Sequence, residues 1–568
     1  MHSGWFPIPD NYRKAGVVAD ILAGLTLGIL LIPQAMAYGM LAGVPPVYGL
    51  YAALLPMLVY GLLASTPHVS VGPTALASLL CLNGISGLAE PGSSAYLGYA
   101  ILLAGLTGFL QLLFGLLRLG GIGSLLSRPV LSGFVSAAAV LIAVSQLDVL
   151  LGITTSRTAY FHDSLLALAA GFSTFHWPSA ILGIGSLGGL FLAKALLPDK
   201  FPTMLVLIIG ATLLVWGVGG EWGIITVEEI PAGLPMFQLP AFELTHLAQL
   251  LPVALVLALI SFIETISIGK AFSPRHPYYR VQPNRELVAL GLSKLAGMFL
   301  QAIPTSASFS RSAVVESNGG KGPLSNVSAV VLLVIVLLFL TPVFYYLPVP
   351  VLAAIIIFSI RKLFDVAEMR RLWHLARKEF ATLMITFLFT LFAGLQYGIA
   401  GGVLLSLFFV FARAARPHLA ELGRVPGTNA FRNRNRFAEA EIDPSVLIIR
   451  FDAELYFGNA AYFRDHLEQL VDQRGEDLCA VILDSHTIND IDTSGIFALS
   501  RFLDGLEKRN VELFLTGTIG PVRDMLYKSG LMQRMGADHL FLSIQQALEH
   551  LESDRCERGW DRPAVQHD

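Results

Sequence analysis

Two stretches decide the fold of this chain: HVSVGPTALASLL at residues 68–80 and AIPTSASFSRSAVV at residues 302–315. Both are polar or interrupted by proline, whereas the sequence around them supplies apolar runs long enough to cross a membrane. Each is the third apolar segment of its half of the chain. Broken segments at matching places in two halves predict a transporter-type binding site near the middle of the bilayer. The alternative is that they are ordinary loops beside interfacial helices.

The composition indicates a membrane protein. Of the 568 residues, 54% are hydrophobic and only 14% are charged, whereas soluble domains carry about a quarter charged residues. Apolar segments recur from Ile21 to Phe411, and we expect about fourteen membrane-spanning segments. The first of them is expected to be a retained helix, because no signal-peptide pattern precedes it. A net charge of -3 argues against a nucleic-acid partner. The three cysteines lie far apart and predict neither a disulfide framework nor a metal site.

The composition changes sharply near Arg413, where apolar blocks give way to soluble sequence. Runs such as VLIIRF, AVILD and VELFLT predict buried strands, and the segments between and after them predict helices. Alternating strands and helices favour an α/β domain with a partly parallel sheet. The expected order is an N-terminal cytoplasmic segment (1–14), a transmembrane domain (15–418), a linker (419–440), a soluble domain (441–553) and a C-terminal tail (554–568).

The placement of charge predicts the orientation. The loop at residues 219–243 is acidic, whereas the joints that hold Arg118, Lys194, Arg275 and Arg361 are basic. Basic joints face the cytoplasm. Since the soluble domain follows the basic side, we expect it and the N-terminus to be cytoplasmic.

Glu264 is the acidic residue most suited to carry a proton. It lies inside the apolar run VALVLALISFIETISIGKAF, where an ionised carboxylate is costly unless it is paired, wetted or protonated. Ser261, Glu264 and Thr265 share one helix face, which we expect to point into the protein. The alternative role for Glu264 is a structural hydrogen bond or ion pair with a neighbouring helix.

A second set of residues favours an anion site. Arg311 follows Ser308 and Ser310 at the expected start of a half-helix, and Thr74 and Ala75 start the matching half-helix after Pro73. Two helix N-termini that face each other would offer unpaired N–H groups and partial positive charge. Arg311 would add a permanent charge, unless it serves only as a structural partner.

Two further candidates lie in the first span, and three lie in the soluble domain. Gln34 and Tyr38 share a helix face after Pro33 and could bind substrate or hold helices together.

In the soluble domain, the motif INDIDTSGIFALS places an Asp-Thr-Ser-Gly sequence at a helix start, where an N-cap alone explains it. Phosphorylation there is the regulatory alternative. The regulatory candidates are Asp492, Thr493 and Ser494.

Together these motifs resemble the SulP family of anion transporters with a C-terminal STAS domain. The resemblance rests on residues 33–56, SVGPTALAS, IETISIGKAF, residues 284–314 and DIDTSGI, and it covers nearly the whole chain. The part from Glu264 to Val314 is most similar to plant and bacterial proton-coupled sulfate permeases. Ala307 stands where glycine is common, which adds a methyl group to the expected anion pocket.

The resemblance implies a fold of seven plus seven helices in an inverted repeat, divided into core and gate domains, in a homodimer. It places the anion between the third and tenth helices. Glu264 matches the acidic residue linked to proton coupling, while Ser308, Ser310 and Arg311 match the tenth-helix anion site. Gln34 and Tyr38 match first-helix residues that face it. The STAS loop of the family is phosphorylated in some relatives, and the STAS domain is expected to offer a surface for a cytoplasmic partner.

The expected function is secondary active anion transport, with proton-coupled sulfate symport by alternating access as the leading hypothesis. Moving a divalent anion inward against 100 mV costs about 4.6 kcal/mol, which inward protons can offset. Bicarbonate or a C4-dicarboxylate, with sodium as the coupling ion, is the first alternative, because carboxylate and hydroxyl oxygens also suit a hard cation. A non-transporting anion sensor or channel with STAS output is the second. The sequence shows no nucleophile–base set of the kind that would predict an enzyme, and no cofactor is expected.

Overall fold

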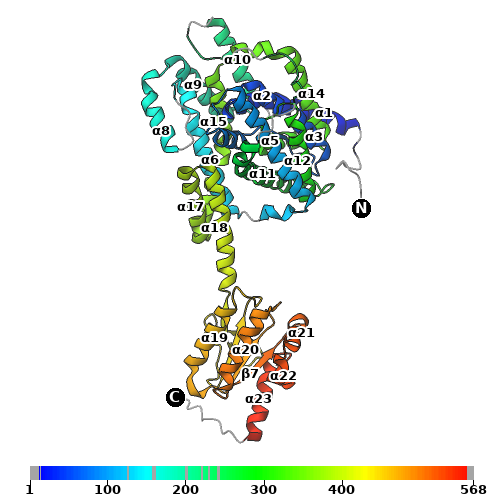
Figure 1. Ribbon diagram of the computed structural model, residues 1–568, viewed down its shortest axis with the longest axis vertical. Helices are drawn as coiled ribbons and strands as arrows, with labels where there is room; N and C mark the ends of the chain where they lie inside the picture. Colours follow the sequence, from blue (N-terminus) through cyan, green and yellow to red (C-terminus); the bar gives the residue numbers. More distant parts are fainter. Residues whose placement is uncertain are drawn as a thin grey trace. The chain divides into compact units, whose positions relative to one another are not determined.

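The computed structural model describes Tyr12 and residues 14–124, 127–155, 161–198, 203–218, 222–227, 231–238 and 244–558. The chain divides into two compact units, Met1–Ser406 and Leu407–Asp568. The first is helical and the second is an α/β domain (Figure 1).

Long apolar helices dominate the first unit, because backbone N–H and C=O groups in lipid must be satisfied within the chain. Within the described residues, seven stretches are long and apolar enough to cross a membrane, and four apolar helices are shorter. The helices are α1 (Lys14–Leu41), α2 (Pro46–Ala52), α3 (Leu55–Leu63), α4 (Ala75–Ile85), α5 (Ser94–Leu116), α6 (Arg128–Ser145), α7 (Leu147–Leu151), α8 (Phe161–Ala170), α9 (Trp177–Leu196), α10 (Thr203–Val218), α11 (Leu244–Phe272), α12 (Pro283–Met298), α13 (Phe309–Ser317), α14 (Leu324–Ile335), α15 (Val349–Ile360), α16 (Val366–Leu375), α17 (Arg377–Ala393) and α18 (Leu395–Ala415).

The helices follow the predicted seven-plus-seven order. In the described part of the chain, the first seven segments are α1, α2 with α3, α4, α5, α6 with α7, α9 and α10. The second seven are α11 to α15, α17 and α18. Packing repeats this symmetry, since α1 contacts α13 and α14 while α11 contacts α4 and α5. The predicted fold class is therefore confirmed.

Most of the helices of this unit pack in two groups. The core group contains α1 to α5 and α11 to α14, and the gate group contains α6, α9, α10, α15 and α17. In Figure 1 the gate helices α6, α9 and α15 lie to the left of this unit, and the core helices α1, α3 and α12 lie to the right.

The two broken stretches become short strands followed by short helices. Strand β1 (Val71–Gly72) precedes α4, and strand β2 (Ser306–Ala307) precedes α13. They pair in antiparallel register, with Val71 opposite Ala307 and Gly72 opposite Ser306. The predicted half-helices are thus joined at their starts by a two-residue ribbon.

Helices α5 and α12 cross very closely in the core group. A Cβ atom on Gly291 would lie 2.5 Å from the backbone nitrogen of Leu112 and 2.8 Å from the carbonyl oxygen of Gly108. Small residues permit this approach, as they do at many membrane helix interfaces. The crossing fixes α12 against α5, and α12 leads into β2.

The second unit is built on a six-stranded sheet in the order β4-β3-β5-β6-β7-β8. Strands β5, β6, β7 and β8 are parallel, and β3 is antiparallel to both of its neighbours. The strands are β3 (Leu419–Arg424), β4 (Phe431–Asn433), β5 (Val446–Phe451), β6 (Ala480–Asp484), β7 (Glu512–Thr516) and β8 (Leu540–Phe541), and the helices are α19 (Ala460–Arg474), α20 (Thr493–Glu507), α21 (Gly520–Lys528), α22 (Leu531–Met535) and α23 (Ile544–Arg558).

The predicted linker at residues 419–440 needs correction, because it contains β3 and β4 of this sheet. Ala420 and Leu422 alternate with more exposed residues and pack in the same apolar cluster as Val446 and α23. This half-buried pattern is weaker than the continuous apolar run of β5, so the sequence did not reveal it. The predicted strand VLIIRF matches β5 in full.

We expect Gly291→Ala to destabilise the transmembrane unit by about 2 kcal/mol, because the added methyl group would overlap the backbone of α5. The measurement is the thermal unfolding midpoint of the detergent-solubilised protein. Gly98→Ala on α5 is the matched control, since a Cβ there meets nothing within 4 Å. Equal midpoints for the two variants would contradict the close crossing.

Candidate functional site

The candidate site is the region where α4 and α13 begin. Thr74 caps α4, because its hydroxyl accepts a hydrogen bond from the backbone N–H of Ala77 at 3.3 Å. Ser308 caps α13 in the same way, by accepting from the backbone N–H of Arg311 at 3.5 Å. Because β1 and β2 pair side by side, these two helix starts lie at the two ends of one ribbon. Their positive dipole ends therefore act on the same small region.

Backbone and side-chain hydrogen bonds hold the ribbon closed. Ser308 N–H donates to the carbonyl oxygen of Ser70 at 3.1 Å, and Ser70 N–H donates to the Ser312 hydroxyl at 3.0 Å. From α14, the Asn326 side-chain amide donates to the carbonyl oxygen of Val69 at 3.2 Å. These bonds satisfy buried, irregular backbone that has no helical hydrogen bonds of its own.

Arg311 reaches from α13 across to the joint before α4. Its Nη1 donates to the carbonyl oxygen of Pro73 at 2.9 Å, and its side chain is only 1% exposed. Its Nε and Nη2 atoms have no hydrogen-bond partner among the described residues. A buried guanidinium with unused donors is costly unless something accepts from it.

The other predicted anion-site residues lie at different depths. Ala75 is buried at the first position of α4, and Ser308 is half-buried, whereas Ser310 is exposed. The Ser308 and Ser310 hydroxyls lie 3.2 Å apart. Tyr38 is buried on α1 and interacts with both Arg311 and Ser359 of α15. Gln34 instead packs towards α10, where its amide lies 3.8 Å from the sulfur of Met204.

Glu264 lies next to the ribbon. The hydroxyl of Ser306, in β2, donates to its carboxylate. Arg311 also acts on Glu264 electrostatically, although no ion pair joins them. The predicted polar face of α11 does point inward, since Ser261 and Thr265 are both buried. Glu264 thus bonds to β2, the strand that directly precedes the helix carrying Arg311.

The sequence reasoning missed a buried lysine on α12. Lys294 is 1% exposed, and its Nζ donates to the Gln111 side-chain oxygen at 2.8 Å. Gln111, on α5, donates in turn to the Ser261 hydroxyl at 2.7 Å. A lysine within an expected span was a usable signal, since ionisable residues at membrane depth are functional candidates.

Glu286, near the start of α12, was also missed. It is fully buried, and its carboxylate accepts hydrogen bonds from Tyr60 at 2.6 Å, from Thr66 at 3.0 Å and from both the hydroxyl and the backbone N–H of Ser65. These donors fasten the loop that leads into β1 onto α12. Glu286 therefore anchors the path of the chain into the site.

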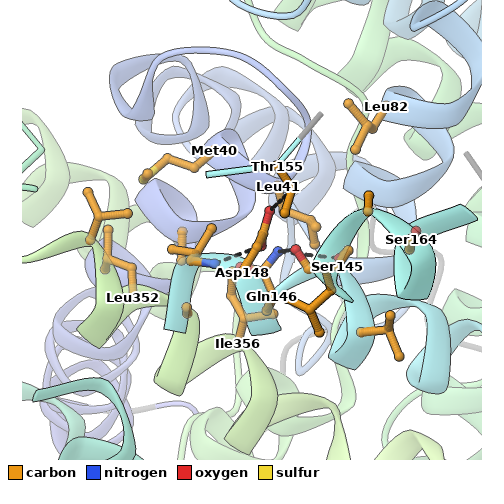
Figure 2. Close-up of a pocket in the computed structure, with 17 residues that line it drawn as sticks. Met40, Leu41, Leu82, Ser145, Gln146, Asp148, Thr155, Ser164, Leu352 and Ile356 are labelled. Atoms are coloured by element: carbon orange, nitrogen blue, oxygen red, sulfur yellow. Dashed lines mark hydrogen bonds between the residues drawn. The ribbon is translucent and has the colours of Figure 1, made fainter. Parts of the chain in front are cut away.

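A cavity lies between the core and gate groups, one turn beyond Tyr38 on α1. Met40 and Leu41 line it from α1, Leu82 from the last turn of α4 and Leu352 from α15 (Figure 2). Figure 2 also shows Asp148 accepting a hydrogen bond from the Thr155 hydroxyl at 2.7 Å. None of the predicted anion-site residues lines this cavity.

In the soluble unit, Asp492 is the N-cap of α20, as the sequence predicted. Its carboxylate accepts from the N–H groups of Gly495 at 2.8 Å and Phe457 at 2.9 Å. Thr493 is exposed and Ser494 is half-buried. Phosphorylation of this loop stays a prediction.

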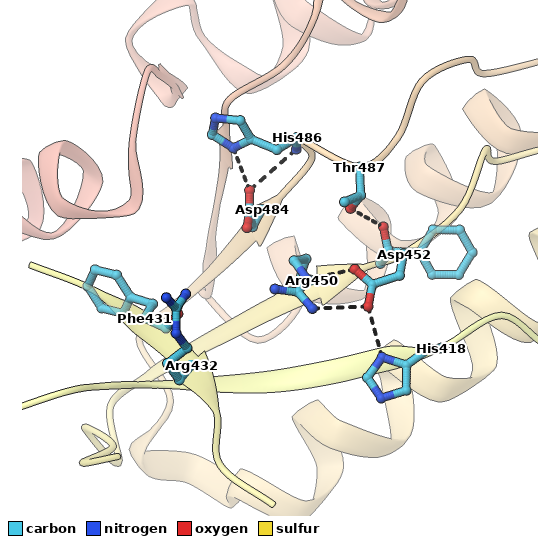
Figure 3. Close-up of polar contacts among 9 residues, drawn as sticks. His418, Phe431, Arg432, Arg450, Asp452, Asp484, His486 and Thr487 are labelled. Carbon is cyan, nitrogen blue, oxygen red and sulfur yellow. Dashed lines mark hydrogen bonds and ion pairs between the residues drawn. The ribbon is translucent and has the colours of Figure 1, made fainter. Parts of the chain in front are cut away.

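A polar cluster lies at the ends of β5 and β6 (Figure 3). Asp452 accepts from Arg450 at 2.6 Å and lies 2.9 Å from His418. Burial by itself would raise the pKa of the Asp452 carboxyl, but these two partners outweigh it and lower that pKa below its ordinary value. The cluster ties β3 to β5.

Comparison with known proteins fits this architecture. Residues 17–386 match the model of the sulfate permease family, and residues 437–547 match that of the STAS domain. The chain belongs to the sulfate permease family. Chloroplastic sulfate transporter 4.1 of Arabidopsis thaliana is 34% identical over 95% of this chain and 81% of its own length. A probable sulfate transporter of Mycobacterium tuberculosis is 31% identical over 96% of this chain and 98% of its own.

Solved structures share the fold. Murine solute carrier 26 family member A9, an anion transporter in the inward-facing state, matches with a TM-score of 0.87 at 25% identity over 95% of this chain and 92% of its own. The transmembrane domain of a cyanobacterial bicarbonate transporter matches with a TM-score of 0.61 at 23% identity over 71% of this chain and 99% of its own. This chain is thus a multi-pass membrane protein of an anion transporter family.

We expect Glu286→Ala to lower the free energy of unfolding by about 3 kcal/mol, because four donors would lose their acceptor in a buried site. Tyr60→Phe removes one of those donors and should cost only about 1 kcal/mol. Thermal unfolding of the purified full-length protein measures both. A Glu286→Ala variant that unfolds with the wild-type midpoint would rule out the anchoring role.

Proposed function

We propose that this chain is a proton-coupled sulfate symporter that works by alternating access. The observation that carries this proposal is the contact between Glu264 and Ser306. It connects a carboxylate that can bind a proton to the strand from which the anion-site helix α13 starts. The names of the curated relatives support sulfate as the substrate.

Arg311 and the two helix starts would bind the anion. Arg311 holds two buried donor atoms without a described partner, close to the N-termini of α4 and α13. A tetrahedral oxyanion can accept from a guanidinium and from helix-end N–H groups together. Without an anion, the Nε and Nη2 atoms of Arg311 would lack acceptors. This cost favours the state in which an anion is bound.

Protonation of Glu264 would help the anion to bind. An ionised Glu264 repels an incoming anion, and a proton removes that repulsion. Each negative charge that enters against a potential of 100 mV costs about 2.3 kcal/mol, so a co-transported proton offsets one of the two charges of sulfate. The proton and the anion would thus bind cooperatively and cross together.

The movement would take place between the core and gate groups. The anion-site residues Thr74, Ser308 and Arg311 all belong to the core, whereas Ser359, which interacts with Tyr38, belongs to the gate. The cavity beyond Tyr38 lies at this same boundary. We propose that the core slides past the gate, that the STAS unit is cytoplasmic and that the transporter is a homodimer.

We expect Glu264→Gln to abolish the dependence of sulfate transport on a proton gradient while leaving sulfate exchange intact, because glutamine cannot release a proton. The measurement is radiolabelled sulfate uptake into proteoliposomes with and without an inward proton gradient. Glu90→Gln, which alters an exposed loop carboxylate, is the matched control. Uptake by Glu264→Gln that still rises with the proton gradient would exclude the proton-carrier role, and dependence on sodium would assign sodium instead.

We expect Arg311→Gln to raise the sulfate KM at least tenfold, which corresponds to about 1.4 kcal/mol of lost binding. Arg371→Gln, on the exposed surface of α16, should leave the KM unchanged. Labelled uptake over a range of sulfate concentrations gives both values. An unchanged KM in a folded Arg311→Gln protein would make Arg311 a structural residue.

A further inference from the structure

Helix α16 has no role in the proposed transport cycle, although it lies at a defined level of the transmembrane unit. It joins α15, which ends at Ile360, to α17. Arg361 follows α15 directly, and the charged residues of α17 are confined to its first three positions, 377–379. From Phe380 to the end of α17 at Ala393 the sequence carries no charge. Helix α16 therefore lies where the apolar parts of two neighbouring helices end, which is the level of a membrane–water interface.

One face of α16 is apolar and partly exposed. Val366, Met369 and Trp373 recur at the i, i+3 and i+7 spacing of a single helix face. Val366 is 43% exposed and Trp373 is 52% exposed. The Trp373 ring meets the ring of Phe380 edge-on, with 5.0 Å between their centroids, so it lies beside the first uncharged turn of α17. An exposed tryptophan at this level is typical of side chains that lie in a membrane interface.

Basic side chains border this apolar face. Arg370, Arg377 and Lys378 are exposed, and none of them takes part in an ion pair among the described residues. Arg371 differs, because it pairs with a glutamate of the same helix at 3.3 Å. The guanidinium carbon of Arg377 lies 5.9 Å from the centre of the Trp373 ring, so charge and apolar surface are direct neighbours. Such a helix fits a surface that is negatively charged outside and apolar inside.

Helix α16 is fixed to the gate group. Asp365 caps it, because its carboxylate accepts a hydrogen bond from the backbone N–H of Glu368 at 2.9 Å. The backbone N–H of Asp365 donates to the hydroxyl of Ser136, on α6, at 3.3 Å. Leu372 is buried, and α16 packs against α17, which packs in turn against α6. A ligand that holds α16 would therefore hold the gate.

We propose that α16 and the first turn of α17 form an interaction surface for anionic phospholipids. Arg370, Arg377 and Lys378 would bind the headgroup phosphates, while Val366 and Trp373 would lie at the level where the acyl chains begin. Phosphate oxygens accept strongly from guanidinium and ammonium groups, and a negatively charged leaflet attracts basic segments beside a membrane. A soluble anion would bind the cations but leave the apolar face in water, so the surface is assigned to lipid.

Bound lipid would fix the gate at its depth in the bilayer while the core moves. The lipid surface itself does not depend on the proposed function, and only this mechanical role rests on it. The two parts have separate readouts, because lipid contact is measured without transport.

The contact is measured on the full-length protein in nanodiscs that contain equal amounts of phosphatidylglycerol and phosphatidylcholine, with bromine on the acyl chains of one lipid at a time. Bromine quenches tryptophan fluorescence at short range, and the Trp373 signal is the difference between the wild type and Trp373→Phe. We expect brominated phosphatidylglycerol to quench this signal at least about twofold more than brominated phosphatidylcholine, because the basic side chains concentrate the anionic lipid. The excess should fall at high salt, which screens exposed charges.

The triple variant Arg370→Gln, Arg377→Gln and Lys378→Gln should lower this quenching ratio to about one. Since the three side chains are exposed, the variant should keep the wild-type thermal unfolding midpoint. The matched control replaces the three exposed arginines at residues 432–436 of the soluble unit with glutamine. It removes the same number of charges and should keep the wild-type ratio.

The gate role is measured by labelled sulfate uptake into proteoliposomes. We expect phosphatidylglycerol to raise the maximal rate of the wild type at least about twofold over phosphatidylcholine alone, and to leave the rate of the triple variant unchanged. The KM should be the same in both lipids, because none of these side chains belongs to the anion site.

The outcomes separate lipid binding from transport. If neither brominated lipid quenches Trp373, α16 faces water, the soluble unit or a second copy of the chain, and the proposal is wrong. Equal quenching by both lipids, or an excess that inorganic phosphate removes at constant ionic strength, would overturn the assignment to anionic lipid. An intact excess with uptake that ignores phosphatidylglycerol would overturn the gate role alone. Absence of sulfate transport in every lipid would contradict the proposed function, whereas the quenching excess would still support the lipid surface.

Discussion

The pairing of β1 with β2 is the constraint on which the rest of this structure depends. A chain that stops being helical in the middle of a bilayer exposes N–H and C=O groups that lipid cannot satisfy. Here a two-residue antiparallel ribbon satisfies part of them, and Arg311, Ser312 and Asn326 satisfy others from the side. Since each strand is followed at once by a helix, the pairing also brings two helix N-termini together. The same bonds that make the break tolerable thus create the region in which we propose that the anion binds.

Buried charge is the second constraint, and it follows from the first. Arg311 is needed to bridge the ribbon to Pro73, yet its positive charge cannot remain uncompensated in the core. Glu264 lies next to the same ribbon, where Ser306 donates to its carboxylate, and Lys294 is a second buried basic side chain, bonded to Gln111. Packing of Gly291 against α5 holds Lys294 and Glu286 at their depths in the same helix.

Residues with a local signature were predictable. Pro73 and the serine-rich run up to Ser312 predicted where the two apolar segments are interrupted. Glu264 was predictable as a carboxylate within an apolar span. The N-cap role of Asp492 and the strand VLIIRF could also be read locally, because they depend on neighbouring residues alone. Lys294, Gln111 and Ser306 could not be connected in this way. They lie on α12, α5 and β2, and only the crossing of these elements shows that their side chains act on α11. The strands β3 and β4 were missed because half-buried strands gain their apolar face only from the sheet.

The sequence by itself determined that this chain crosses a membrane many times, interrupts two apolar segments at matching places and ends in an α/β domain. These properties follow from local hydropathy, proline placement and strand periodicity, which need no knowledge of partners. Only the tertiary structure decided which side chains come together: that Arg311 reaches the joint before α4, that Ser306 binds Glu264 and that Lys294 binds Gln111. The physical reason is that electrostatic energy at low dielectric depends on distances between groups far apart in the chain, which packing alone sets.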